Sequence, residues 1–348
     1  MSLSIGLVGL PNAGKSTLFN ALTCQEVLMA DYPFATIEPH YGIVAIPDSR
    51  LKVLANIFNS SKITPATIEF IDIAGLIKGA HQGEGLGNQF LNHIRQTSLI
   101  AQIVGVFNQN NIAEDLEIVR LELMLADNQS LTRHQDKIQK NARTDKQLAK
   151  VLEILQLAKA ELDQEIWLYD SPHRLLYLEH LNYLNLLTLK PTVAVINYQN
   201  SQEQRIDYQS LETKKIPLIC LDAKLELEIS QLQSEDQAFF LKEYNLRETG
   251  LDRLARLCFE TLNLQTFLTA GQKETRAWII PSNCPAPEAA GIIHSDMQTG
   301  FIAVDVINYS DLIKFKSWSL AKSSGVCRTE GKNYLMKTDD VVEFKFNL

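Results

Sequence analysis

Short apolar runs alternate with amphipathic stretches over much of the chain. Apolar runs of strand length, bounded by polar turns, predict β-strands. The predicted strands cover residues 3–8, 41–46, 68–73, 100–107, 191–196 and 216–221. Helical periodicity predicts helices over residues 15–22, 87–97 and 235–244. Strands that alternate with helices are typical of an α/β fold with a doubly wound, mostly parallel sheet.

A long stretch without glycine interrupts this alternation at residues 113–189. Leucines recur there at helical spacing in two places, at Leu148, Leu152 and Leu155 and at Leu175, Leu178 and Leu181. We expect a helical insertion, formed by an antiparallel hairpin and a return helix. The stretch contains 9 Lys/Arg and 13 Asp/Glu. A solvated arm and a partner-binding arm are both compatible with this pattern.

The pattern changes again after residue 263. Shorter apolar runs at 277–280, 300–306 and 341–346 are separated by turns that contain Pro and Gly. These features favour a small, strand-rich terminal domain.

The composition is that of an ordinary globular protein, with 348 residues, 45% hydrophobic residues and a formal net charge of −8. The acidic balance argues against a general nucleic-acid coat protein, which would depend on positive charge. No signal-peptide pattern and no apolar run of about 18 residues is found, so we expect a cytoplasmic protein without a membrane span. The cysteines lack metal-ligand spacing, which disfavours a zinc site or a disulfide framework. They are Cys24, Cys220, Cys258, Cys284 and Cys327.

Residues 9–16 read Gly-Leu-Pro-Asn-Ala-Gly-Lys-Ser and match the phosphate-loop pattern GxxxxGK(S/T). The loop lies between a predicted strand and a predicted helix, where backbone N–H groups and the helix N-terminus can surround phosphate oxygens. We expect Lys15 to be exposed until it contacts the β- and γ-phosphates, and Ser16 to ligate Mg²⁺. The predicted nucleotide contacts in the loop are Asn12, Ala13, Gly14, Lys15, Ser16 and Thr17.

A second motif, Asp72-Ile73-Ala74-Gly75, comes at the end of the strand predicted at 68–73. Asp72 would hold the Mg²⁺ shell, and Gly75 would offer its N–H to the γ-phosphate. Thr36 lies between the two motifs and would close over Mg²⁺ when the γ-phosphate is present. This order is that of a nucleotide-dependent switch. It predicts Ser16, Thr36 and Asp72 as metal ligands and Lys15, Thr36 and Gly75 as catalytic residues.

Leu76 stands at the catalytic position where many such switches have a water-orienting glutamine. A leucine side chain cannot form a hydrogen bond with water, so another group organises the attack or hydrolysis is slow. Residues 78–87 contain four glycines, which favours a mobile loop that gates hydrolysis, with a purely structural loop as the alternative. His81 in this loop is a candidate catalytic aid, although an exposed loop histidine is more often idle.

With these motifs, the chain resembles the YchF subfamily of the Obg-related GTPases, the Obg-like ATPases. The resemblance covers nearly the whole chain. Matching segments in the first part are residues 9–19, 32–39, 72–79 and 83–91. Matching segments in the last part are residues 263–266, 273–278, 289–294, 300–302 and 330–332.

The resemblance implies three domains. A P-loop nucleotide-binding domain would cover residues 1–112 and 190–262, a helical coiled-coil insertion residues 113–189, and a TGS domain with a β-grasp fold residues 263–348. The resemblance also implies hydrolysis of ATP, often in preference to GTP, and association with ribosomes. A hydrophobic residue at the position of Leu76 is a family characteristic.

The sequence departs from the family pattern in two places. The family's base-recognition element usually reads Asn-x-x-Glu, whereas this chain has Asn197-Tyr198-Gln199-Asn200. The family usually has a longer loop, with a histidine linked to hydrolysis, where residues 108–114 are short and contain no histidine. The second departure bears on hydrolysis more than on nucleotide binding.

The base-recognition residues favour ATP over GTP. Guanine presents two donors that a carboxylate would accept, whereas the amide of Asn200 complements the acceptor N1 and donor N6 of adenine. The alternative is that Asn200 does not touch the base. Residues 222–224 (Asp-Ala-Lys) resemble the family's Ser-Ala-Lys loop beside the base. The predicted base contacts are Asn197, Asn200, Asp222, Ala223 and Lys224.

Asn12 suggests K⁺ as a second cofactor beside Mg²⁺, because potassium-activated switches have an asparagine here. Alternatively, Asn12 only stabilises the turn. The leading functional hypothesis is a switch that slowly hydrolyses ATP and binds the translation machinery. The rivals are a hydrolysis-deficient scaffold that signals by nucleotide occupancy, a GTP-specific switch and a small-molecule kinase. The kinase is disfavoured by Thr36 and the Asp72–Gly75 motif.

Overall fold

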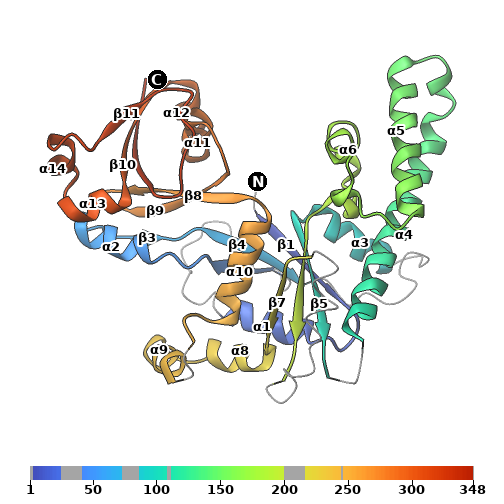
Figure 1. Ribbon diagram of the computed structural model, residues 1–348, viewed down its shortest axis with the longest axis horizontal. Coiled ribbons are helices and arrows are strands. Elements are labelled where there is room, and N and C mark those ends of the chain that lie inside the picture. The colour runs from blue at the N-terminus through green and yellow to red at the C-terminus, as the bar shows by residue number, and fades with distance from the viewer. Residues whose placement is uncertain are drawn as a thin grey trace. The chain divides into compact units, whose positions relative to one another are not determined.

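The computed structural model describes residues 3–24, 41–72, 86–107, 111–199, 216–243 and 246–347. Contacts divide the chain into two compact units, shown together in Figure 1. Unit 1 consists of Met1–Val44 and Ile68–Cys258, and unit 2 of Ala45–Thr67 and Phe259–Leu348.

Unit 1 is built on a six-stranded sheet with the order β2-β4-β1-β5-β6-β7. Strand β1 pairs in parallel with β4 and β5, and β6 pairs in parallel with β5 and β7. The strands are β1 (Ser4–Gly9), β2 (Tyr41–Ala45), β4 (Thr67–Asp72), β5 (Leu99–Gly105), β6 (Thr192–Asn197) and β7 (Leu218–Leu221). Every residue of β1, β5 and β6 is buried, as expected for the apolar central strands of a parallel sheet covered on both faces. The predicted mostly parallel sheet is confirmed.

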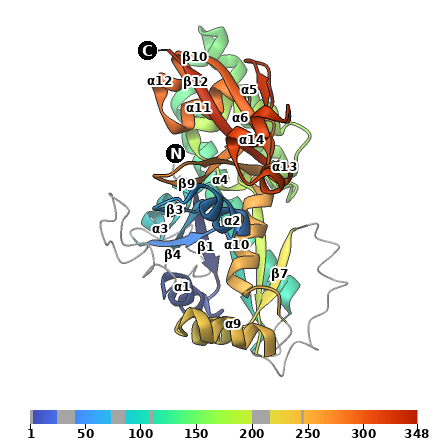
Figure 2. The same ribbon diagram turned by 90° about the vertical axis from the view of Figure 1, so that its left-hand side faces the viewer.

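Helices cover both faces of this sheet. Helix α1 (Lys15–Cys24) packs against α8 (Ala223–Ser230), whereas α3 (Leu86–Gln96) and α4 (Ile112–Ile138) pack against β1 and β5. Figure 1 shows these two pairs on opposite sides of the sheet, and Figure 2 shows the paired strands β4 and β1 next to each other. Strand β4 lies beside β1 on one side, and the chain then crosses to β5, which lies beside β1 on the other side. Right-handed crossovers therefore place a topological switch point beside the end of β1. Helices α9 (Ser234–Glu243) and α10 (Gly250–Thr261) follow α8.

The glycine-free stretch forms the antiparallel hairpin and the return helix that its periodicity predicts. The hairpin consists of α4 and α5 (Lys146–Asp163), which are joined by a 3₁₀ turn at Asn141–Arg143, and the return helix is α6 (Arg174–Leu181). Further 3₁₀ turns cover Leu168–Asp170, Asn182–Leu184 and Leu187–Leu189.

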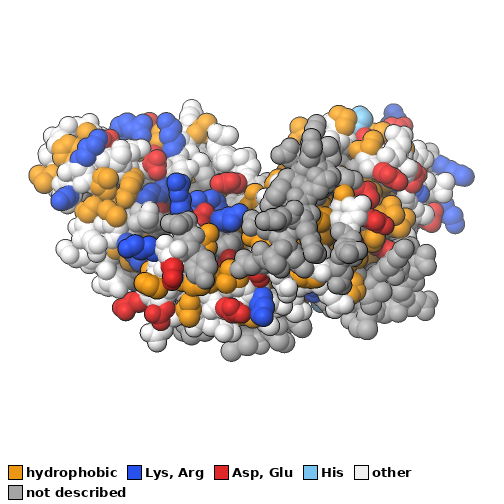
Figure 3. Space-filling view, turned by 60° about the horizontal axis from the view of Figure 1, so that its bottom comes forward, with side chains coloured by type: hydrophobic (Ala, Val, Ile, Leu, Met, Phe, Trp, Pro, Cys, Tyr) orange, Lys and Arg blue, Asp and Glu red, His pale blue; other side chains and the backbone are white. Residues whose placement is uncertain are grey.

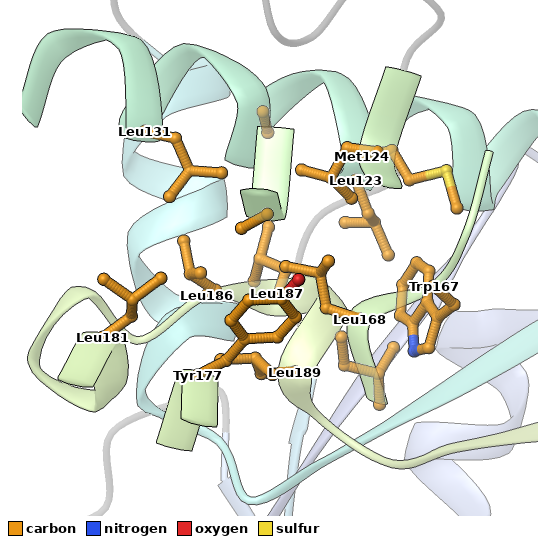
Figure 4. Close-up of a cluster of buried hydrophobic side chains, with 14 of the residues drawn as sticks. Leu123, Met124, Leu131, Trp167, Leu168, Tyr177, Leu181, Leu186, Leu187 and Leu189 are labelled. Atoms are coloured by element: carbon orange, nitrogen blue, oxygen red, sulfur yellow. The ribbon is translucent and has the colours of Figure 1, made fainter. Parts of the chain in front are cut away.

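One hydrophobic core joins these helices to the sheet. It includes Val8 and Ile100 from the strands, Leu123 and Leu131 from α4, and Leu155 from α5. Figure 4 shows the part of this core around Trp167 and Tyr177, whose side chains lie among the leucines that precede β6. The base of the hairpin is therefore continuous with unit 1.

The helical spacing of the leucines in α6 does not correspond to a continuous buried face. Leu175, Leu178 and Leu181 all lie in α6 at the predicted helical spacing, but Leu175 is 80% exposed and does not belong to a buried face. The buried pair on α6 is Tyr177 and Leu181, which lie four residues apart and share a helix face.

Unit 2 contains a mixed sheet with the order β11-β10-β12-β8-β9-β3. Strands β8 and β12 are parallel neighbours in its centre, while β8–β9, β10–β11 and β10–β12 are antiparallel pairs. The strands are β8 (Leu264–Ala270), β9 (Thr275–Pro281), β10 (Phe301–Asn308), β11 (Arg328–Glu330) and β12 (Asp340–Phe346). Helix α11 packs on β9 and β10, in a β-grasp arrangement. The helices are α11 (Ala286–Ile293), α12 (Ser295–Thr299), α13 (Tyr309–Phe315) and α14 (Trp318–Ser323).

Residues 45–67, which lie between the phosphate loop and the Asp72–Gly75 motif in sequence, also belong to unit 2. Helix α2 (Ser49–Phe58) packs on β8, β9 and α13, and β3 (Ile63–Thr64) pairs in parallel with β9. The guanidinium of Arg50 contacts Asp48, Asp339 and the hydroxyl of Thr266. Arg50 thus ties this segment to Thr266 in β8, 216 residues later, and to Asp339, 289 residues later. The predicted domain boundaries remain a prediction, since they describe functional domains rather than contact clusters.

Candidate functional site

The phosphate-loop motif forms a tight turn between β1 and α1. The N–H of Ala13 donates to Leu10 O at 3.3 Å, and the N–H of Leu18 donates to Gly14 O at 3.0 Å as α1 begins. Asn12 and Gly14 have φ values of +65° and +87°. A side chain at Gly14 is excluded, because its Cβ would lie 1.9 Å from Nδ2 of Asn197. The local sequence therefore folds the loop that its motif predicts.

Lys15 is buried, and our expectation that it is exposed is wrong. Its side chain is 8% exposed, and its ammonium donates to Oδ1 of Asp72 at 2.8 Å. The parallel pairing of Leu7 with Asp72 brings the end of β4 beside the beginning of the loop. A carboxylate one strand away thus balances the charge of Lys15.

A cavity of about 730 Å³ opens above the loop. Its walls come from the segments that follow the carboxyl ends of β1, β5, β6 and β7, the usual location of ligands in a doubly wound sheet. The volume is that of a small-molecule site. The described residues that line it are Leu10, Pro11, Asn12, Ala13, Gly14, Lys15, Ser16, Thr17, Phe107, Asn197, Gln199, Asp222 and Lys224.

Asn197 connects the phosphate loop to the segment after β7. Its Nδ2 donates to Ala13 O at 3.0 Å, and its Oδ1 accepts from the N–H of Ala223 at 3.0 Å. The residue is 3% exposed. Both ends of the amide are thus engaged, so Asn197 positions two walls of the cavity.

Asp222 is the N-cap of α8. Its carboxylate accepts from the backbone N–H groups of Lys224 and Leu225 at 3.0 and 3.1 Å. Asp222 and the exposed Lys224 line the cavity, whereas Ala223 is buried behind them. The aspartate that replaces a small residue in the family pattern therefore has a capping function.

A buried carboxylate holds the next helix in place. Glu226 accepts from the N–H groups of Gly250 and Leu251 at 2.8 and 3.3 Å, at the beginning of α10. Burial raises the pKa of Glu226, although these two donors favour the charged form. The position of α8 below the cavity is thereby fixed to α10.

Several predicted site residues lie outside the described residues. They are Thr36, Gly75, Leu76, His81 and Asn200. The segment at 108–114 is partly described: Asn111 caps α4 through a bond from Ala113 N, and the helix begins at Ile112. Residues 112–114 therefore belong to the helix and not to a loop.

Phe107 was not predicted as a site residue. It lies two residues after the end of β5 and lines the cavity. Gly105 makes room for it, because a Cβ there would lie 2.6 Å from the Phe107 ring. The strand predicted at 100–107 ends at Phe107, and its position at the carboxyl end of a parallel strand was the available sequence signal.

The donor set beside Lys15 suits a hard cation. The exposed Ser16 lines the cavity, and the Asp72 side chain is 19% exposed next to Lys15. Hydroxyl and carboxylate oxygens are the ligands that Mg²⁺ prefers. Among the described residues, no group of three or more His, Cys, Asp or Glu side chains could hold a metal ion.

Comparisons with known proteins agree with this geometry. The family described as 50S ribosome-binding GTPase matches residues 4–197, and the C-terminal family of YchF GTPases, described as a protein of unknown function, matches residues 264–347. The ribosome-binding ATPase YchF of Haemophilus ducreyi is 41% identical, with 100% of both chains covered. The chain belongs to the YchF family.

The other similarities support the same assignment. The ribosome-binding ATPase YchF of Bacillus subtilis is 39% identical over the full length of both chains. The solved structure of the Schizosaccharomyces pombe YchF GTPase superposes with a TM-score of 0.85 at 30% identity, covering 99% of this chain and 98% of that one. The family and the P-loop fold that the motifs predict are therefore confirmed. No helix in the described part of the chain has the length and apolar character needed to cross a membrane.

Proposed function

We propose that the chain is a nucleotide-dependent switch that binds ATP with Mg²⁺, hydrolyses it slowly and acts on the ribosome in the cytoplasm. The observation that carries this proposal is the position of Lys15. Lys15 lies at the N-terminus of α1, at the switch point of the sheet and at the floor of a 730 Å³ cavity. The YchF relatives are named ribosome-binding ATPases, which supports both the ATPase activity and the ribosome as partner.

Different residues of the site would bind different parts of the triphosphate and its metal ion. Backbone N–H groups at the beginning of α1 and the ammonium of Lys15 would bind phosphate oxygens, so Lys15 must exchange Asp72 for phosphate. Ser16, Asp72 and the predicted Thr36 would hold Mg²⁺, which when bound neutralises charge on the phosphates. Gly75 would donate its N–H to the γ-phosphate. Asn197 keeps the loop in the shape that this binding requires.

The base would lie toward the residues that line the cavity after β5, β6 and β7. The Phe107 ring offers an apolar surface there, while Asp222 and Lys224 lie on the segment after β7. Asn200 would select adenine. Asn12, with its positive φ in the loop, would hold K⁺ together with a phosphate oxygen. Equal ATPase rates in KCl and NaCl at the same ionic strength would remove K⁺ from this proposal.

The decisive experiment is a single-turnover assay with radiolabelled ATP and GTP, combined with dissociation constants for both nucleotides. Tight binding of ATP with slow release of phosphate is expected. Tight binding without phosphate release would instead identify a scaffold that signals by occupancy, and a clear preference for GTP would identify a GTP-specific switch. Cosedimentation with purified ribosomes, in the presence of ATP or ADP, tests the partner.

A further inference from the structure

Basic side chains are concentrated where the α4–α5 hairpin turns. We call residues 133–150 the hairpin tip. The tip contains six Lys/Arg and only two Asp/Glu, whereas the rest of the segment 113–189 contains three Lys/Arg and eleven Asp/Glu. The basic residues are Arg133, Lys137, Lys140, Arg143, Lys146 and Lys150. An acidic arm therefore ends in a basic tip.

The hairpin carries this charge away from the sheet. Helix α4 has 27 residues and is therefore about 40 Å long. Figure 1 shows the turn between α4 and α5 at the end of the hairpin remote from the strands. Ala142 is the one buried residue in the tip, and it anchors the 3₁₀ turn. The tip is thus an accessible projection of unit 1.

The basic side chains of the tip are available to a partner. All six are exposed, and none forms an ion pair with another described residue. Of the two acids, Asp145 uses its carboxylate to cap α5 through Gln147 N and Leu148 N. Even with both carboxylates counted, positive side chains outnumber negative ones by six to two in the tip.

Local helix stability does not explain this arrangement. Cations near the C-terminus of α4 interact favourably with the helix dipole, as Lys137 does. Lys146 and Lys150, however, lie in the first turns of α5, where the dipole disfavours cations. Six neighbouring like charges without ion pairs also repel one another. The positive charge is therefore better explained by a ligand than by folding.

We propose that the hairpin tip binds the phosphate backbone of RNA. This inference rests on the proposed action on the ribosome and names the surface that makes the contact. Contacts with a nucleic-acid backbone need only exposed Lys and Arg, with no apolar anchor. The tip exposes no large hydrophobic side chain among its described residues, which disfavours a protein interface or insertion into a membrane. Elsewhere, acidic and basic side chains both occur on the face shown in Figure 3.

The test uses the full chain, a fluorescein-labelled RNA hairpin and fluorescence anisotropy at a series of KCl concentrations. The tip variant combines Lys137→Gln, Lys140→Gln and Lys146→Gln. The matched control removes three equally exposed lysines that lie elsewhere, through Lys52→Gln, Lys242→Gln and Lys273→Gln. A third variant replaces the three tip lysines with arginine. Circular dichroism and ATP binding verify that each variant is folded.

The tip variant should bind the RNA hairpin roughly tenfold more weakly, and the slope of log K against log salt should fall by roughly 0.7–0.9 for each lost phosphate contact. The control and the arginine variant should bind like the wild type. Equal RNA affinity and slope in the tip variant, or an equal loss in the control, would overturn the proposal.

Two further probes separate the sources of binding. Loss of affinity for phosphatidylserine vesicles or polyglutamate, with RNA binding unchanged, would also overturn the proposal and assign the tip to a membrane or an acidic protein. Ribosome cosedimentation of the wild type tests the proposed function separately. If the wild type fails to cosediment with ribosomes but the tip variant loses RNA binding, the assignment of the tip as an RNA-binding surface is supported. The proposed action on the ribosome is then rejected.

Discussion

The ammonium of Lys15 donates a hydrogen bond of 2.8 Å to the carboxylate of Asp72, joining the phosphate loop to the end of the neighbouring strand. Both groups are predicted ligands of one nucleotide–metal complex, and here each neutralises the other. A triphosphate must therefore compete with Asp72 for Lys15. The Mg²⁺ that accompanies the nucleotide would compensate Asp72 in turn, which couples metal binding to phosphate binding.

Replacing Lys15 tests this relationship. Lys15→Ala should abolish measurable binding of a non-hydrolysable ATP analogue in calorimetric titration. Because it leaves Asp72 without its partner in a mostly buried site, the variant should also lose about 1–3 kcal/mol of unfolding free energy. Lys224→Ala, which removes an exposed lysine from the same cavity, should leave the stability unchanged. Wild-type nucleotide affinity in Lys15→Ala would refute the site assignment.

Asn197 should matter for the shape of the cavity more than for contact with the base. Asn197→Ala removes the bonds to Ala13 O and Ala223 N, and we expect a loss of about 1–3 kcal/mol in urea denaturation without nucleotide. Nucleotide affinity should fall for ATP and GTP alike. Gln199→Ala, at an exposed position of the same wall, serves as the control and should not change stability. An Asn197 variant with normal stability but altered base preference would contradict the positioning role.

Base preference should depend on Asn200. The wild type should bind ATP at least as tightly as GTP, and Asn200→Asp should shift the ratio of dissociation constants toward GTP by about tenfold, because a carboxylate accepts from both guanine donors. Titration with fluorescent analogues of both nucleotides measures the ratio. A tenfold or greater preference for GTP in the wild type would show that another residue reads the base.

Unit 2 should lose stability in acid through Asp305, which is fully buried. Burial by itself would raise the pKa of Asp305, but bonds from Lys345, Thr329 and Lys322 lower it to about 2. Since the ordinary value is about 3.9, the stabilisation is complete above about pH 4 and is lost as the pH falls toward 2.

Urea denaturation at about pH 7 and pH 3 checks this prediction. The stability difference between the wild type and Asp305→Asn should shrink on acidification, and its full size is roughly 2 kcal/mol. Asp296→Asn, at a position where the side chain is 54% exposed, is the control. A difference that does not change with pH would mean that Asp305 contributes through packing and not through its charge.

Sequence motifs predicted those parts of the site that are formed by residues adjacent in sequence. The turn with Gly14, the helix from Lys15 and the strand before them follow from adjacent residues. The bond between Lys15 and Asp72 could not be predicted, because it depends on the pairing of strands 57 residues apart in sequence. The same holds for Asn197, which reaches the backbone of Ala13 across 184 residues.

The missed elements have a similar cause. Helix α2 was not predicted, and its residues Leu51 and Leu54 are buried in a unit formed mainly by the end of the chain. No local signal shows that β3 pairs with β9. The exposed Leu175 illustrates a different limit, since three leucines at helical spacing do not reveal which neighbours cover them.

Intrinsic turnover should be slow, below about 1 s⁻¹ for the purified chain, compared with roughly 1–10³ s⁻¹ for typical enzymes. Leu76 cannot orient the attacking water. The segment from Phe107 to the end of the first turn of α4 contains no histidine that could orient the water instead. Lys15, Mg²⁺ and backbone N–H groups would position the phosphates but leave the nucleophile unaligned, and alignment contributes several kcal/mol to catalysis.

A partner that supplies the missing group in trans should therefore accelerate hydrolysis, as activating proteins do with an arginine. Phosphate release measured with and without purified ribosomes tests both statements. The Leu76→Gln variant should be faster than the wild type without a partner, because glutamine can orient water, while Leu76→Met should leave the rate unchanged. If the isolated wild type releases phosphate faster than about 1 s⁻¹, a residue of the chain itself aligns the water, and His81→Ala is then the variant that should reduce the rate.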